Sequence, residues 1–104
     1  MDDSPLDAQV RFAIANKRLL QFTYLGAVRV AEPHDYGIQK GLTRLLVYQL
    51  RGRGSAARHS EKGWRLLDVA KIDGCGVLDE TFPDSRGQAH QHHPVWDLVY
   101  ARVD

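Results

Sequence analysis

Apolar residues recur at helical spacing near the start of this chain, which predicts its first element. Between Pro5 and Arg18 they fall on one helix face, at Leu6, Val10, Ala13 and Ile14. Ser4 offers a hydroxyl that can cap the helix. Pro5 suits the first turn because backbone N–H groups there have no partner within the helix, so a residue without an N–H loses no hydrogen bond. We therefore expect a helix over residues 5–18.

A period of two replaces the helical period after Arg18. Leu20, Phe22 and Tyr24 alternate with polar residues, which is typical of a half-buried strand. Gly26 permits a tight turn, so a returning strand is expected to pair with the first as a hairpin.

The returning strand carries Val28 and Val30 on one face, so Arg29 is expected to point away from them. Pro33 lacks the N–H that a ladder needs and is expected to end this strand. Residues 33–41 are then expected to lack regular secondary structure.

The second half of the chain adds further strand signals. Residues 42–50 are apolar on both faces, which favours a central or barrel strand, and residues 51–63 indicate a long hairpin loop. Strands are expected at 64–69 and 71–78, with a bulge or kink at residues 74–76 and an end at Phe82 and Pro83. Residues 95–100 are apolar enough to form a final strand or a short helix.

These elements predict a mostly β fold, a small β-barrel of about five strands (19–82) preceded by one N-terminal α-helix. With 104 residues there is room for one domain. We assign residues 1–83 to it and residues 84–104 to a polar, His-rich segment and C-terminal extension.

Composition narrows the class of protein. The chain is 43% hydrophobic and 26% charged, which is too apolar for a disordered protein. Residues 1–5 do not resemble a secretory signal, and no run approaches the roughly 20 apolar residues of a membrane span. We expect a cytoplasmic protein without a membrane partner.

Cys75 is the only cysteine, so no internal disulfide is possible.

Charge is unevenly distributed although the net charge is +1. Residues 40–65 hold seven basic residues and one acidic residue, whereas residues 66–104 hold three basic and seven acidic residues. The basic block is able to steer a polyanion. A cationic loop that is merely solvated is the alternative.

The order and spacing of several short segments resemble those of the WYL domain family. The resemblance covers residues 10–82 and is most specific from Arg29 to the strand that ends at Tyr48. Its segments are Ala13-Ile14, Lys17-Arg18, Leu20 to Tyr24, Arg29 to His34, Gly37, Gly41, Leu46-Val47-Tyr48, Trp64 to Leu67, Lys71-Ile72 and Phe82.

The resemblance implies an Sm-like or SH3-like β-barrel after a helix, as in bacterial regulators and CRISPR-associated accessory proteins. There the domain senses nucleic acid or nucleotide-like ligands and implies no catalysis. The tripeptide that names the family falls on Arg44-Leu45-Leu46, which keeps only its last residue, and Lys71 replaces the usual arginine. Lysine keeps the charge but lacks the fork that grips phosphate at two points.

Five residues are the candidates for a ligand site. Arg29 and Arg65 lie on predicted strands and Lys71 begins another, so their cations are suited to neutralise phosphate. For the arginines, the alternative is a structural salt bridge with Glu32 or Asp35. His34 and Tyr48 are able to orient a ligand by hydrogen bonding or base stacking. A satisfied loop histidine and a packed strand tyrosine are the corresponding alternatives.

Signals for catalysis and metal binding are weak. His90, His92 and His93 are grouped, yet neither a cysteine nor a paired carboxylate stands at ligand spacing, so we expect no metal and no cofactor. Cys75 has no recognisable base, and the sequence contains no nucleophile or phosphate-loop motif. We expect a protein that is not an enzyme.

Two hypotheses follow. The first is a ligand-sensing regulatory module that binds single-stranded nucleic acid or a nucleotide. The second is a module for homo-oligomerisation or for a regulatory protein partner, which binds through open strand edges.

Overall fold

The computed structural model describes residues 5–52, 63–83 and 96–103, with the side chains of residues 51–52 excepted. It confirms the expected class, since strands predominate and follow one N-terminal helix. In chain order the elements are α1 (Pro5–Asn16), β1 (Arg18–Tyr24), β2 (Ala27–Gln39), β3 (Leu42–Gly52), β4 (Gly63–Asp68), the 3₁₀ turn η1 (Val69–Lys71), β5 (Ile72–Thr81) and β6 (Leu98–Arg102).

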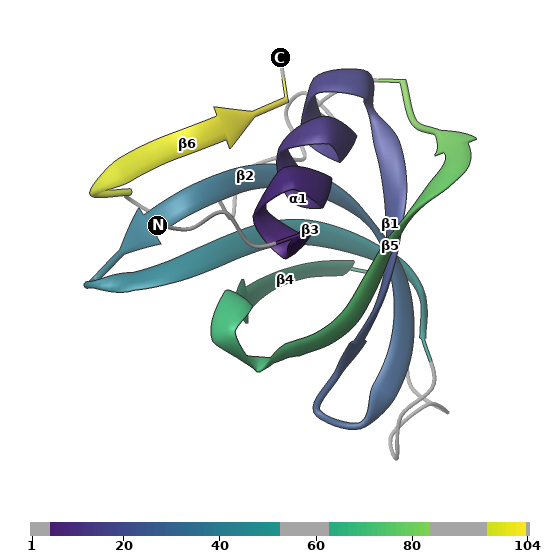
Figure 1. Cartoon of the computed structure of the whole chain (residues 1–104), viewed down its shortest axis with the longest axis horizontal. Coiled ribbons are helices and arrows are strands. Elements are labelled where there is room, and N and C mark those ends of the chain that lie inside the picture. Colours follow the sequence, from purple (N-terminus) through teal and green to yellow (C-terminus); the bar gives the residue numbers. More distant parts are fainter. Residues whose placement is uncertain (1–4, 53–62, 84–95, 104) are drawn as a thin grey trace.

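The described strands form one antiparallel sheet in the order β4-β3-β2-β1-β5, and β6 pairs with β2 (Figure 1). Its two end strands, β4 and β5, do not pair with each other, so the sheet is strongly curved but not closed. The closure expected of a barrel is therefore absent among the described residues. The sixth strand, β6, overlaps residues 95–100, for which the sequence allowed either a strand or a short helix.

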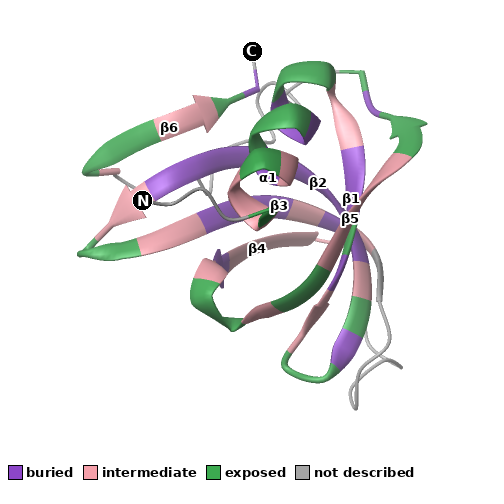
Figure 2. Cartoon of the chain, viewed as in Figure 1, coloured by how far each residue is buried: buried purple, intermediate pink, exposed green. Residues whose placement is uncertain are grey.

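Strand β2 corrects the prediction for residues 33–41. It continues through Pro33 to Gln39, and its middle is the longest buried stretch among the described residues (Figure 2). On one edge β2 pairs with β1 as far as Ala31 and with β6 from Asp35 onward. Pro33 lies in the gap between these two ladders, beside a bulge at His34. A proline is tolerated there because no partner strand needs its N–H.

Most of the core lies on one face of the sheet, which we call the inner face. It carries the buried side chains of Leu20, Phe22, Leu45, Val47 and Leu67. Helix α1 contributes Val10, Ala13 and Ile14 to the same cluster and packs on β1, β2, β5 and β6. We call the opposite face the outer face, and alternation along each strand assigns the remaining residues to one face or the other.

Two further sequence expectations are confirmed. Strand β3 is central, between β2 and β4. Strand β5 bulges at Gly74, because Phe22 pairs with Cys75 while Thr23 pairs with Asp73, and Gly74 takes the left-handed φ of +67° that favours glycine. Most of the expected loop at 51–63 and the histidines of residues 84–94 lie outside the described residues.

Strand β6 is held against β2 by more than its ladder. The Val103 N–H donates to the carbonyl oxygen of His34 at 2.9 Å, and the Val103 side chain is buried. The buried Asp35 carboxylate accepts hydrogen bonds from Arg102, at 3.0 Å from Nε and 3.4 Å from Nη2. Residues 98–103 are thus packed on the sheet.

A hydrogen bond between Tyr36 and Asp7 ties α1 to β2. The Tyr36 hydroxyl donates to Oδ1 of Asp7 at 2.7 Å. Burial, followed by this bond to Asp7, raises the pKa of Tyr36 well above its usual value. Burial also acts to raise the pKa of Asp7, but the hydrogen bonds from Tyr36 and Arg11 outweigh it and lower that pKa.

The raised pKa of Tyr36 predicts a loss of stability at alkaline pH. Its contribution is complete below the unfolded-state pKa of about 10 and declines at up to about 1.4 kcal/mol per pH unit above it, because the unfolded chain then releases the proton first. We expect Tyr36→Phe to be about 1–2 kcal/mol less stable than the wild type near neutral pH. Urea unfolding should show this difference shrinking above about pH 10; a difference that stays constant would contradict the assignment.

Within the described ranges, no helix is both long enough and apolar enough to cross a membrane.

Candidate anion-binding site

Arg29 lies on the inner face of β2, where it pairs with Phe22. It points away from Val28, which pairs with Thr23, and this confirms the expected orientation. Its Nη1 donates to Oε1 of the buried Gln49 at 3.3 Å, and its Nη2 donates to the carbonyl oxygen of Tyr24 at 3.2 Å. The guanidinium carbon lies 5.4 Å from the centre of the Tyr24 ring. Every one of these partners is neutral.

The charge of Arg29 is not matched by a carboxylate among the described residues. Of the two acids considered as salt-bridge partners, Glu32 contacts His34 and Asp35 contacts Arg102. The Nε of Arg29 is buried, and in the described part of the chain it has no hydrogen-bond acceptor. A buried N–H without an acceptor is costly, about 1–3 kcal/mol, so an anionic ligand that accepted from it would recover this energy.

Arg65 places a second cation on the inner face. It pairs with Val47 on β3 and is diagonal to Gln49, which pairs with Gly63. A Cβ at Gly63 would lie 3.0 Å from Nη1 of Arg65, so the missing side chain makes room for the guanidinium. That Nη1 donates to the carbonyl oxygen of Trp64 at 3.0 Å. Arg29 and Arg65 therefore flank Gln49 from β2 and β4.

Tyr24 connects this group to the end of β4. Its hydroxyl accepts from the N–H of Asp68 at 3.0 Å, across the curve of the sheet. Lys71 is exposed in η1, directly before Ile72, which pairs with Tyr24. The third predicted cation thus belongs to the same end of the sheet as Tyr24.

His34 and Tyr48 belong to a second group. Tyr48 pairs with Glu32 and with Trp64, which places it on the outer face. His34 has no exposed surface; its Nε2 lies 3.0 Å from Oε1 of the buried Glu32, and its ring centre lies 4.9 Å from that of Trp64. The Tyr48 and Trp64 ring centres are 5.2 Å apart. His34 is a strand residue and not the loop histidine that the sequence indicated.

The five candidate residues are therefore divided by the sheet. Arg29 and Arg65 share the inner face with Lys71 nearby, whereas His34 and Tyr48 join Trp64. Gln49 and the carbonyl of Tyr24, which hold Arg29, were not singled out from the sequence. The pairing of strands brings them together, and no local motif marks them.

The described residues contain neither a group of metal ligands nor a cysteine with a lowered pKa. They contain no group of three or more histidine, cysteine or acidic side chains able to hold a metal ion, and His90, His92 and His93 lie outside them. Burial raises the pKa of the Cys75 thiol to about 11. Such a thiol is rarely a thiolate near neutral pH, which is the reactive form.

Comparison of the chain with protein-family models, with curated proteins and with solved structures gave no match. The resemblance to the WYL family consequently stays a prediction.

Proposed function

We propose that this chain is a non-catalytic, WYL-like sensing module that binds single-stranded nucleic acid or a nucleotide-like anion in a cytoplasmic regulatory role. The observation that carries the proposal is Arg29, a strand-held guanidinium with neutral partners and a buried Nε without an acceptor in the described residues. Arg65 adds charge on the same face, and Lys71 adds charge at the same end of the sheet. A guanidinium held on a rigid strand binds phosphate with less loss of side-chain entropy per hydrogen bond.

The fold supports the same proposal at a coarser level. One helix precedes a curved antiparallel sheet in which β1 to β4 form a meander, and η1 connects β4 to β5, which pairs with β1. A small Sm-like or SH3-like barrel after a helix is what the family resemblance implies, and a mostly β chain that begins with one helix is compatible with it, although β4 and β5 do not close the sheet. The fold alone does not define the ligand, so the inner-face arginines decide the proposal.

Binding of a fluorescent single-stranded oligonucleotide, measured by anisotropy over a salt series, tests this function. We expect Arg29→Gln combined with Arg65→Gln to weaken binding at low salt by about tenfold or more, and to reduce the log–log salt slope by about 1.4, since each phosphate contact to a single strand contributes about 0.7. Thermal unfolding of the variant checks that the sheet still forms.

The matched control removes two charges elsewhere. Lys17 and Lys40 both have a φ of +53°, which asparagine tolerates better than most residues. We expect Lys17→Asn combined with Lys40→Asn to keep most of the affinity. Equal losses in the two double variants would show that net charge alone drives binding and would overturn the assignment to the inner face.

An interaction module is the second candidate, and one observation favours it. Strand β4 pairs with β3 without a register shift, and the far edge of β4 is unpaired within the described residues. A regular free edge is able to accept a strand from another chain. Light scattering that showed a defined oligomer, together with no oligonucleotide binding at low salt, would favour this candidate over the first.

A further inference from the structure

A pocket of about 330 Å³ lies over the sheet at the β2–β1–β5 side, away from the inner-face arginines. It is lined by residues 21–23 of β1, Val28 of β2 and residues 74–76 of β5. Gln21 pairs with Gly76 and Thr23 pairs with Val28, so these residues present the outer face. The volume is at the lower end of the range for small-molecule sites, about 300–1,000 Å³.

The pocket exists because β5 lacks side chains there. A Cβ built at Gly74 or at Gly76 would meet no atom within 4 Å. Phe22 and Cys75 pair with each other and, by alternation, carry their side chains toward the inner face, so their backbones form the floor. The result is a surface of peptide groups with no side chain of the described residues over Gly74 and Gly76 and with open space above it.

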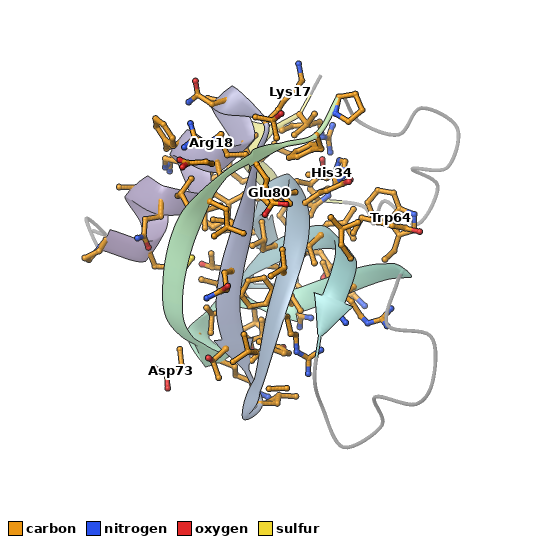
Figure 3. All side chains as sticks on the ribbon, turned by 90° about the vertical axis from the view of Figure 1, so that its right-hand side faces the viewer. Lys17, Arg18, His34, Trp64, Asp73 and Glu80 are labelled. Carbon is orange, nitrogen blue, oxygen red and sulfur yellow. The ribbon has the colours of Figure 1, made fainter. Side chains whose placement is uncertain are left out.

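The walls of the pocket are neutral. No residue that lines it carries a charge; Val28 is 48% exposed and offers an apolar side, whereas Gln21 and Thr23 offer an amide and a hydroxyl. These two groups both donate and accept hydrogen bonds. The bulge also leaves Gly74 outside the β1–β5 pairing, which frees its backbone groups for a ligand. Asp73, next to Gly74, lies at the opposite end of the molecule from His34 and Trp64 (Figure 3).

From this geometry we propose that the glycine-lined pocket binds a neutral planar heterocycle such as a nucleobase. A planar ring is thin enough to lie against the peptide groups of Gly74 and Gly76, where no side chain intervenes, and its polar edge can meet the amide of Gln21 and the hydroxyl of Thr23. A charged ligand would find no countercharge in the lining. This site is separate from the arginines of the proposed function and does not depend on them.

Titration of the ¹⁵N-labelled chain with adenosine, followed by two-dimensional NMR, tests the proposal. We expect shift changes concentrated at residues 21–23, 28 and 74–76, and none with ribose, which lacks the ring. Gly76 has no left-handed φ and has open space beside it, so Gly76→Leu is expected to fill the pocket without strain and to weaken adenosine binding about tenfold or more.

The outcomes separate this site from the anion site. Arg29→Gln combined with Arg65→Gln should bind adenosine as the wild type does, and inorganic phosphate should shift arginine side-chain signals without moving those of Gly74 and Gly76. Absence of adenosine-dependent shifts at the pocket would overturn the proposal. Undiminished binding by Gly76→Leu would overturn it as well.

Discussion

Gly37→Ala is expected to lower the free energy of unfolding by about 3 kcal/mol and to loosen β6 from β2. Gly37 is buried on β2 and pairs with Arg44 and with Val99. A Cβ at this position would overlap the carbonyl oxygen of Leu98 and approach the Cα of Val99, at 2.9 Å. Both are backbone atoms, so no side-chain rotation relieves the overlap and β6 itself has to move.

Urea unfolding measures the loss, and hydrogen exchange of the β6 amides reports where it occurs. Gly76→Ala is the matched control, because it adds the same methyl group to a strand glycine that has open space beside it. We expect its free energy of unfolding to stay within about 0.5 kcal/mol of the wild type. If both variants were equally stable, the close approach of Leu98 to Gly37 would be refuted.

Arg102→Met is expected to cost about 2 kcal/mol of stability. The Asp35 carboxylate has no exposed surface, and removing the cation from a buried pair typically costs 3–5 kcal/mol. We expect a smaller loss because the Arg102 side chain is 41% exposed, so water already screens part of the attraction.

The Arg102→Lys variant separates the contribution of the positive charge from that of the two hydrogen bonds to Asp35. Lysine keeps the cation but cannot reproduce the two hydrogen bonds from Nε and Nη2. We expect it to lose about half as much as Arg102→Met in the same unfolding measurement. Equal stability of the wild type and both variants would mean that this pair adds nothing to the docking of β6.

The parts of the fold that local pattern determines were predictable. Helical spacing located α1, and the alternation of residues 20–24 located β1. The glycines of residues 74–76 indicated the bulge. Pro33 misled because its usual effect depends on whether a neighbouring strand needs its N–H. At Pro33 the neighbour changes from β1 to β6, and a change of neighbour is a tertiary feature that the local sequence does not contain.

In the candidate site, too, some features follow from the local sequence and others depend on how the strands pair. The orientation of Arg29 followed from alternation with Val28, and it is confirmed. Gln49 was not selected, because its role depends on the register that sets β3 between Arg29 and Gly63. The sequence contains a signal for the glycine-lined pocket, since Gly74 and Gly76 are two residues apart. The strand that lies beside these glycines could not be predicted, because it depends on the pairing of Gln21 with Gly76.

The change of partner along β2 bears on the order in which the chain folds. Strands β1, β2 and β3 each pair with the strand that follows in sequence, so β1 to β4 can assemble through contacts between neighbouring segments of the chain. Asp35 and Arg102 are 67 residues apart, and contacts at that separation slow folding because the entropy of closing the loop is lost first. We therefore infer that the meander forms early and that the β2 edge beyond Pro33 stays open until β6 arrives. During this interval, the open edge of β2 is able to pair with a foreign strand.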